Sequence, residues 1–342
     1  MNIHILLPQK EFFLDKSPGA VSIMVSDQLK FSKFKKKINV YGSINIKKNY
    51  KNFFKPIKKS FFFKNKNYLK DFSKYSIKKN SIIEIHNRPF YFKYLKKKYP
   101  ESKFILYFHN NPLDLKGSQT SSERQYLLNN CDHIIFLSNW IKRKFFKNLN
   151  KNTKNHTVVY PGCVKLKKIT KKKNFIVFVG KLNHAKGYDI FSKFASLFTK
   201  VHKNWNILSV GDEPRRTIPQ NSSIKELGPL NHSKVLNLLK ISKISIANSR
   251  WEEPLGRLPI ESAANACVPI STDRGGLIES NTHGIILKKN SPKELYDACV
   301  KIIDGYNKFQ KKVFDHYKFD SVLMNQKLDL IRERVFNTNF QI

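Results

Sequence analysis

The sequence of 342 residues is short of acidic residues, of cysteine and of long apolar runs. Asp and Glu number 25 against 64 Lys and Arg, and the resulting formal net charge of +39 points towards polyanionic partners. The four cysteines lie far apart, without a C-x-x-C pair or histidines at ligand spacing, so a zinc site or a disulfide framework is disfavoured. They are Cys131, Cys163, Cys267 and Cys299.

No window approaches the roughly 18 apolar residues of a membrane-spanning helix. The first residues, MNIHILLPQKEFF, become charged too early for a signal peptide. An internal repeat of fixed period is also missing, so the two halves of the chain are similar architectures rather than copies. We therefore expect a cytoplasmic protein, and peripheral contact with the inner face of the membrane stays open.

Apolar residues make up 40% of the sequence, enough to bury a core in each of two domains. Short β-branched or apolar runs alternate with longer amphipathic stretches, which predicts an α/β fold of two doubly wound, Rossmann-like domains facing a cleft. The polar stretch 165–174 separates a first domain, 1–168, from a second, 169–314, and a C-terminal segment, 315–342. The predicted strands are residues 3–7, 82–85, 104–108, 133–137, 157–160, 175–179, 205–210, 244–247, 268–270 and 284–287.

Between Lys30 and Asn80 this alternation breaks down into lysine with interleaved Phe and Tyr, a stretch that we name the basic strip. It holds 17 lysines and a single acid, Asp71. The basic strip could lie on anionic lipid, or it could bind nucleic acid by stacking its aromatic rings on bases. On lipid, the residues that enter the interface would be Phe61, Phe62 and Phe63. A coding sequence rich in A and T would give the same composition, and the lysines would then only be solvated.

A tight turn follows the predicted strand 175–179. Gly180 ends the strand, and Lys181 and Lys186 flank the turn before the helical pattern YDIFSKFASLF. Such a turn directs backbone N–H groups and a helix N-terminus at a ligand, so two lysines there predict a diphosphate site. Two solvated lysines are the alternative.

Two glutamates, Glu253 and Glu261, lie in the segment SRWEEPLGRLPIESAANACVPI. Pro254 and Gly256 indicate a loop and LPIESAANA indicates a helix start, so Glu261 is expected early in a helix whose N-terminal amides face the same ligand as Glu253. Carboxylates in this position bind sugar hydroxyls bidentately. Pairing of both with surface lysines is the alternative, but acids are scarce in this chain.

The second half resembles, in order and spacing, the donor half of glycosyltransferase family 4. The segments that carry the resemblance are VGKLNHAKG, SVGDEP, ELGPLNHSKVLNLLK, EEPLGRLPIESAANACVPI and STDRGGLIES, and the E-x7-E signature of the family falls on Glu253 and Glu261. The resemblance spans residues 175–302. It implies the GT-B fold and a retaining transferase that uses a nucleotide sugar, such as a UDP- or GDP-sugar, and no cofactor. It also implies that residues 315–335 cross back onto the first domain.

The resemblance implies roles for individual residues as well. Lys181 and Lys186 would hold the donor diphosphate and stabilise the charge that develops on it. Glu253 would position the donor sugar, and Glu261 would bind the ribose. The family usually has arginine where Lys181 stands, so the planar fork is lost there. The base would be lined by Gly228, Pro229 and Leu230, and the phosphate and sugar would be touched by Leu255, Gly256 and Arg257.

The first half resembles the acceptor domain of bacterial members through EIHNRPFYFKYLKKKYP, KFILYFHNNP and HIIFLSNWIKRKF. His109, at the end of a predicted strand, takes the position of the family's active-site histidine, and a purely structural histidine is the alternative. His86 ends another strand and is the weaker candidate. Gly19 in SPGAVS would let the backbone approach the diphosphate.

The predicted enzyme is a metal-independent hexosyltransferase. The sequence has no D-x-D, the motif with which many sugar transferases ligate a divalent metal, and lysines would replace the cation. The acceptor would be a glycan or lipid-linked glycan of lipopolysaccharide or another surface polysaccharide. A nucleotide-sugar epimerase of the same fold is one alternative. A basic nucleic-acid-binding protein is another, although a specific nucleic-acid partner is not expected.

Overall fold

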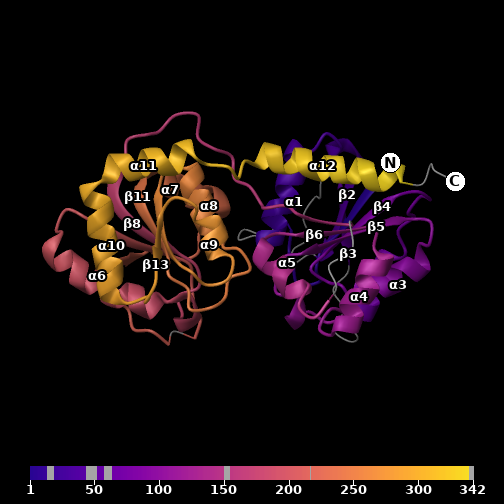
Figure 1. Cartoon of the computed structure of the whole chain (residues 1–342), viewed down its shortest axis with the longest axis horizontal. Helices are drawn as coiled ribbons and strands as arrows, with labels where there is room; N and C mark the ends of the chain where they lie inside the picture. Colours follow the sequence, from indigo (N-terminus) through magenta and orange to yellow (C-terminus); the bar gives the residue numbers. More distant parts are fainter. Residues whose placement is uncertain (14–18, 44–51, 58–63, 150–154, 216, 339–342) are drawn as a thin grey trace. The chain divides into compact units, whose positions relative to one another are not determined.

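The computed structural model describes residues 1–13, 19–43, 52–57, 64–149, 155–215 and 217–338, and it divides the chain into two compact units (Figure 1). Unit 1 comprises Met1–Pro161 and Ser321–Ile342, and unit 2 comprises Gly162–Asp320. The boundary thus lies earlier than the predicted division between residues 168 and 169. The reason is that the linker already bonds to unit 2, where the Leu166 backbone N–H donates to the Ala264 carbonyl at 3.0 Å.

The final segment of unit 1 begins at Ser321 and not at residue 315. The preceding residues are held in unit 2, because the Tyr317 hydroxyl donates to the Cys163 carbonyl at 2.7 Å and the Cys163 N–H donates to the Phe319 carbonyl at 2.9 Å. From Ser321 the chain forms α12 (Ser321–Asn337), which lies beside α1 (Ala20–Phe31) (Figure 1). The chain therefore returns to its first unit.

Unit 1 is built on a seven-stranded parallel sheet with the order β3-β2-β1-β4-β5-β6-β7. Its strands are β1 (Ile3–Leu6), β2 (Ile38–Ser43), β3 (Phe54–Ile57), β4 (Ile82–His86), β5 (Lys103–Phe108), β6 (His133–Phe136) and β7 (His156–Val158). Between them lie α1, α2 (Lys64–Phe72), α3 (Tyr91–Lys98), α4 (Ser121–Asn130), α5 (Asn139–Phe145) and the 3-10 turns Lys35–Lys37 and Pro112–Asp114. The strand order reverses between β1 and β4, which is the topological switch point of this sheet.

Unit 2 repeats the architecture with a six-stranded parallel sheet in the order β10-β9-β8-β11-β12-β13, whose switch point lies between β8 and β11. Its strands are β8 (Lys173–Val179), β9 (Asn206–Val210), β10 (Ile224–Glu226), β11 (Ser242–Ala247), β12 (Val268–Thr272) and β13 (Ile285–Leu287). Its helices are α6 (Tyr188–Val201), α7 (His232–Ile241), α8 (Arg257–Ala264), α9 (Leu277–Ser280), α10 (Pro292–Asp304) and α11 (Tyr306–Asp315). All the predicted strands are present, with ends shifted by at most two residues, and the α/β class is confirmed.

The basic strip contains regular structure that its lysines conceal, so the predicted breakdown of the βα pattern there is wrong. β2, β3 and α2 all lie within it. Its aromatic rings form core beneath the lysines: Tyr41 meets Phe72 edge-on with 4.8 Å between ring centroids, and Phe54 stacks on Phe13 at 5.8 Å. Buried aromatics alternating with exposed lysines are themselves an amphipathic pattern. The run Phe61, Phe62 and Phe63 lies outside the described residues.

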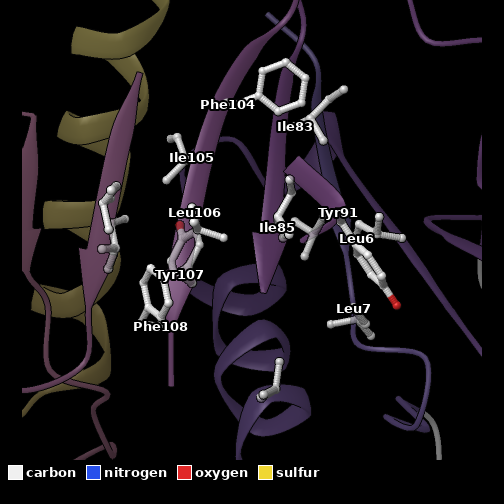
Figure 2. Packing of buried hydrophobic residues seen from close by; sticks show 14 of the residues in the cluster. Leu6, Leu7, Ile83, Ile85, Tyr91, Phe104, Ile105, Leu106, Tyr107 and Phe108 are labelled. Atoms are coloured by element: carbon white, nitrogen blue, oxygen red, sulfur yellow. The ribbon is translucent and has the colours of Figure 1, made fainter. Parts of the chain in front are cut away.

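The central strands of unit 1 are apolar on both faces, as in parallel sheets that are covered by helices on both sides. Figure 2 shows Leu6 of β1, Ile85 of β4 and Phe108 of β5 within this packing, and all are fully buried. Two polar residues of β4 interrupt it, since Glu84 and His86 are both 0% exposed. Buried polar groups need hydrogen-bond or ionic partners, so β4 contributes polar contacts as well as apolar packing.

Candidate active site

Two loops follow β8 and β11, the neighbouring strands on either side of the switch point of unit 2. The first, residues 180–187, leads from β8 to α6, and the second, residues 248–256, leads from β11 to α8. Parallel α/β sheets bind ligands outside the carboxyl ends of their strands at this point. Lys181, Lys186 and Glu253 all lie in these two loops.

The β8–α6 loop contains a 3-10 turn, His184–Lys186, that is fixed at both ends. The Asn183 Oδ1 accepts a hydrogen bond from the Lys186 backbone N–H at 3.1 Å. Gly187 has a φ of 75°, and a Cβ at this position would lie 2.1 Å from the Asn248 carbonyl oxygen, so the position favours glycine. The Asn248 side chain donates to the Gly187 carbonyl at 2.9 Å, which ties the two loops together at their bases.

An ion pair joins the two loops, because the Lys186 Nζ donates to the Glu253 Oε1. The Glu253 side chain is 14% exposed and that of Lys186 is 33% exposed, so the pair is reachable from solvent. The backbone of Glu253 is fixed too, since the Gly276 N–H donates to its carbonyl at 2.6 Å. A Cβ on Gly275 would lie 2.2 Å from that carbonyl oxygen. Lys181 is exposed, and in the described part of the chain it does not share the contact with Glu253.

Glu261, on α8, is 5% exposed, and its Oε1 accepts two hydrogen bonds. The Arg257 Nε donates at 2.9 Å from one turn earlier on α8, and the His232 Nε2 donates at 2.9 Å from the start of α7. Burial would raise the pKa of the Glu261 carboxyl, but the charge of Arg257 and the hydrogen bond from His232 outweigh burial and lower it. Glu261 is therefore a carboxylate anchored between two helices.

The remaining residues of unit 2 that were predicted to bind the donor lie on the same edge of the sheet. Gly228 follows β10 with a φ of 65°, and a Cβ there would meet no atom within 4 Å, so it borders open space. Pro229 is exposed, and Leu230 is half-buried against the apolar cluster of unit 2. Leu255 is buried, and Gly256 precedes α8 as its N-cap residue.

Sequence reasoning missed three side chains that hold this site: His232, Asn183 and Glu213. The Glu213 Oε2 accepts a hydrogen bond from the Asn183 Nδ2 at 2.9 Å, and Glu213 is 7% exposed. Each of these residues stood in a segment already singled out, VGKLNHAKG, SVGDEP or ELGPLNHSKVLNLLK. The available signal was that acids are scarce and that Glu213 closely follows a predicted strand.

The carboxyl edge of the sheet in unit 1 carries the two candidate histidines. His86 is the last residue of β4, His109 directly follows β5, and both are buried. The His86 Nδ1 lies 2.9 Å from the His109 Nε2, a hydrogen-bond distance. The structure thus joins two residues that the sequence named separately.

Gly19 is the N-cap residue of α1, beyond β1 in the same unit. The Glu11 Oε1 accepts hydrogen bonds from the Ser22 backbone N–H at 3.0 Å and from the Ser22 hydroxyl at 2.5 Å. A Cβ on Gly19 would lie 2.6 Å from that oxygen. A carboxylate of the chain itself therefore occupies the anion position at the N-terminus of α1.

The edge of unit 2 combines cations, carboxylates and backbone amides, a set suited to phosphate and hydroxyl groups. Among the described residues, no cluster of three or more His, Cys, Asp or Glu side chains could hold a metal ion. All four cysteines are buried free thiols. In the ranges that the structure describes, we find no helix that combines the length and the apolarity needed to cross a bilayer.

Comparison with known proteins gives a family for unit 2. Residues 164–313 match the family described as glycosyl transferases group 1. The chain is also 24% identical over 289 residues to the putative glycosyltransferase YtcC of Bacillus subtilis, a match that covers 74% of this chain and 68% of that protein.

Solved structures share the fold along nearly the whole chain. Sucrose-phosphate synthase from Thermosynechococcus elongatus has a TM-score of 0.77 at 13% identity, with 98% of this chain and 99% of that chain covered. Anabaena Alr3699/HepE in complex with UDP-glucose gives 0.71 at 14% identity, covering 97% and 99%. WaaG, a glycosyltransferase involved in lipopolysaccharide biosynthesis, gives 0.68 at 13% identity, covering 96% and 99%. The fold is therefore GT-B, with two doubly wound α/β units.

Proposed function

We propose that this chain, a glycosyltransferase of the group 1 type, transfers a hexose from a UDP- or GDP-sugar to a glycan or lipid-linked acceptor, with retention of anomeric configuration. The observation that carries the proposal is the Lys186–Glu253 ion pair at the switch point of unit 2, the place where parallel sheets bind nucleotides. HepE, which has the same fold, is in complex with UDP-glucose, and this makes uridine the first nucleotide to test.

In this proposal Lys186 exchanges Glu253 for the donor diphosphate. The bond between the anomeric carbon and the phosphate oxygen breaks, the bond to the acceptor oxygen forms on the same face, and the acceptor proton passes to the departing phosphate. Lys186, the exposed Lys181 and the N-terminal amides of α6 stabilise the charge that grows on this phosphate. Glu253, once released, accepts hydrogen bonds from the sugar hydroxyls.

Glu261 binds the ribose in the same scheme. Its hydrogen bonds from Arg257 and His232 both fall on Oε1, so Oε2 is the oxygen that takes the ribose hydroxyls. Gly228 borders open space near the half-buried Leu230, a combination that suits the flat face of a base.

We assign the acceptor to unit 1, where His109 lies at the carboxyl edge of the sheet. The likeness to WaaG supports a surface-glycan acceptor such as lipopolysaccharide, reached from the cytoplasmic face of the membrane. The basic strip would supply lysines to anionic lipid. Its aromatic residues Tyr41, Phe54, Tyr68 and Phe72 are buried, which argues against the alternative of stacking on nucleic-acid bases.

A thermal-shift screen of UDP, GDP, ADP and CMP at equal concentrations tests the donor class, because a ligand that binds only the native state raises the Tm. We expect one diphosphate to raise the Tm, and its sugar conjugate to be consumed only when acceptor is present. Lys186→Ala should reduce the shift, whereas Lys200→Ala, which changes an exposed lysine on α6, should preserve it. Conversion of the sugar nucleotide without acceptor would instead identify an epimerase.

The lysine-based site also predicts that transfer needs no divalent metal. Turnover should be unchanged in excess EDTA, measured with the donor that the screen identifies. Loss of turnover that manganese or magnesium restores would show that Lys181 and Lys186 do not neutralise the diphosphate on their own.

A further inference from the structure

A series of buried polar side chains runs through unit 1 from α12 to His109. The Arg332 guanidinium, fully buried, donates to both oxygens of Glu84, from Nε at 2.7 Å and from Nη2 at 2.9 Å. The Glu84 Oε2 lies 4.0 Å from the His86 Nε2, and the other nitrogen of that ring, Nδ1, lies 2.9 Å from the His109 Nε2. This series of polar side chains thus ends at His109, the residue predicted to act on substrate.

His86 is held rigidly in this chain. Its ring stacks on Tyr107 with 4.1 Å between centroids and an interplanar angle of 10°, and the Tyr107 hydroxyl donates to the Glu84 Oε2 at 3.1 Å. The next residue, Asn87, fixes the backbone around His109, because its Oδ1 accepts hydrogen bonds from the N–H groups of His109 at 3.3 Å and Asn110 at 3.2 Å. The end of β4 therefore fixes both the backbone and the ring of His109.

The charges around His86 decide where its proton lies. Burial lowers the pKa of His86, and although Glu84 and Glu11 raise it and Arg332 lowers it further, the net shift is downward. The ring is therefore neutral at pH 7 and carries one proton. Glu84 is ionised, since burial would raise its pKa but Arg332 and the contact with His86 lower the pKa to about 2. A carboxylate facing Nε2 stabilises the proton on that nitrogen, which leaves Nδ1 as an acceptor.

We propose that His86 is a positioning residue for His109: it holds its own proton on Nε2 towards Glu84 and accepts on Nδ1 the hydrogen bond that the His109 Nε2–H donates. His109 is thereby fixed as the tautomer protonated on Nε2, which leaves the lone pair on its Nδ1, an atom that is buried in the structure; a substrate hydroxyl that displaces the atoms covering Nδ1 donates to it. The last clause rests on the proposed function, whereas the tautomer of His109 does not.

Two substitutions separate this role from packing. His86→Phe keeps an aromatic ring against Tyr107 and removes the acceptor, whereas His86→Asn places an amide oxygen close to the position of Nδ1 and keeps the acceptor. We expect His86→Phe to lower kcat at least about tenfold, with the KM for the donor and the Kd for the nucleotide within about twofold of wild type. His86→Asn should restore most of kcat although it lacks the ring.

Nuclear magnetic resonance on the full chain labelled with ¹⁵N-histidine reads the tautomer without substrate. The signals of His86 and His109, assigned from His86→Asn and His109→Gln, should both show a proton on Nε2 in the wild type. In His86→Phe the signal of His109 should move towards a mixture of tautomers. The Tm of each variant reports whether it folds.

The outcomes are distinct. A proton on the Nδ1 of His109 in the wild type, or equal kcat for wild type and a folded His86→Phe, overturns the positioning role. If His86→Asn loses as much kcat as His86→Phe, an acceptor at the position of Nδ1 does not sustain turnover and the proposal is also wrong. If His109→Gln turns over normally while the wild-type tautomer is as expected, the catalytic use of His109 in the proposed function fails and the positioning by His86 stands.

Discussion

Glu253 and Glu261 belong to one short segment, yet they have different partners in the structure. Glu253 meets a lysine from another loop and remains partly open to solvent. Glu261 is buried and anchored by Arg257 and His232. A carboxylate whose partner can leave suits a group that forms and breaks contacts during turnover, whereas an anchored carboxylate suits a fixed binding contact. The two residues should therefore respond differently to substitution.

Substitution of Glu261 should weaken binding of the nucleotide itself. Glu261→Ala removes a charge-assisted hydrogen bond worth about 1.5 to 3 kcal/mol, so affinity for the nucleoside diphosphate should fall roughly tenfold to a hundredfold. Titration calorimetry with the bare nucleotide measures this change. Glu252→Gln, at an exposed position in the same segment, is the control and should bind as the wild type does. Unchanged affinity in a folded Glu261→Ala would remove Glu261 from the nucleotide site.

Substitutions at the ion pair should act mainly on turnover. Glu253→Gln should lower kcat more than nucleotide affinity, because Glu253 touches the sugar. Lys186→Ala should lower both, with the larger effect on kcat, because the charge on the leaving phosphate grows towards the transition state. Steady-state kinetics beside calorimetry distinguish the two patterns. If both variants turned over normally, the reacting groups would have to lie elsewhere.

The sequence placed Lys186 and Glu253 after the ends of two predicted strands, because strand ends can be read from apolar runs. In the structure both residues lie at one edge of one sheet. The choice between Lys181 and Lys186 as the partner of Glu253 was not predictable, since it depends on the 3-10 turn that follows Asn183. His232 was missed because its role depends on the packing of α7 against α8.

At the scale of elements, the site depends on the loop after β12. This loop contributes no charged group to the Lys186–Glu253 pair, but Gly275 and Gly276 let it approach the backbone of Glu253. Gly275 has a φ of 65° and forms a bridge with Glu253. The loop therefore acts as a support for the carboxylate.

Gly275→Ala should displace this support. The new methyl group would meet the Glu253 carbonyl oxygen at 2.2 Å in a backbone conformation that alanine adopts poorly, and we expect a loss of about 1 to 3 kcal/mol in stability together with lower kcat. Gly305→Ala is a matched control, since its nearest contact would be 3.5 Å from Phe309 and its φ is −111°. Chemical denaturation and turnover of both variants test the difference. Equal behaviour of the two would show that the loop tolerates a side chain.

Sequence patterns predicted elements well wherever strands contain continuous apolar runs, as in β5 and β8. They failed for β2 and β3, which lie between lysine-rich segments, and for β10, whose three residues include Lys225 and Glu226. Short or mixed strands gain their stability from neighbours that lie far away in sequence, and single-sequence patterns do not contain that information.

At the scale of the whole molecule, the charge of +39 predicts a dependence on the lipid surface. The protein should sediment with vesicles that contain anionic lipid, and added salt should weaken this binding. Vesicles of neutral lipid are the control. Equal recovery with both kinds of vesicle, or no sedimentation at all, would leave composition as the explanation of the lysines.

Stability should also depend on pH through buried histidines. Burial lowers the pKa of His4 to about 4, and burial with the charges of Arg334 and His156 lowers that of His133 to about 4. The usual value is 6.5, so between pH 6.5 and 4 the unfolded state binds protons that the folded state does not. Stability is then full above pH 6.5 and falls with pH, by up to about 2 kcal/mol for each histidine at pH 5.

Thermal unfolding of the full chain from pH 8 to pH 5 measures this slope. His133→Asn should show a shallower fall than the wild type below pH 6.5 and little change in slope above pH 7. This pH range avoids the titration of Glu84. Its pKa is about 2 in the folded protein against a usual value of 4.5, so the stability that its ionisation contributes is lost only below pH 4.5. A Tm that stays constant down to pH 5 would contradict the burial of neutral histidines.

The return of α12 to unit 1 bears on how the chain acquires its shape during synthesis. A ribosome releases all of unit 2 before it releases α12, although most of unit 1 is made first. Until α12 emerges, Glu84 has no guanidinium partner, and a buried charge without its partner is strongly destabilising. Unit 1 therefore remains incomplete in the nascent chain until unit 2 has been synthesised. The unit that is translated first is thus the one that completes its folding last.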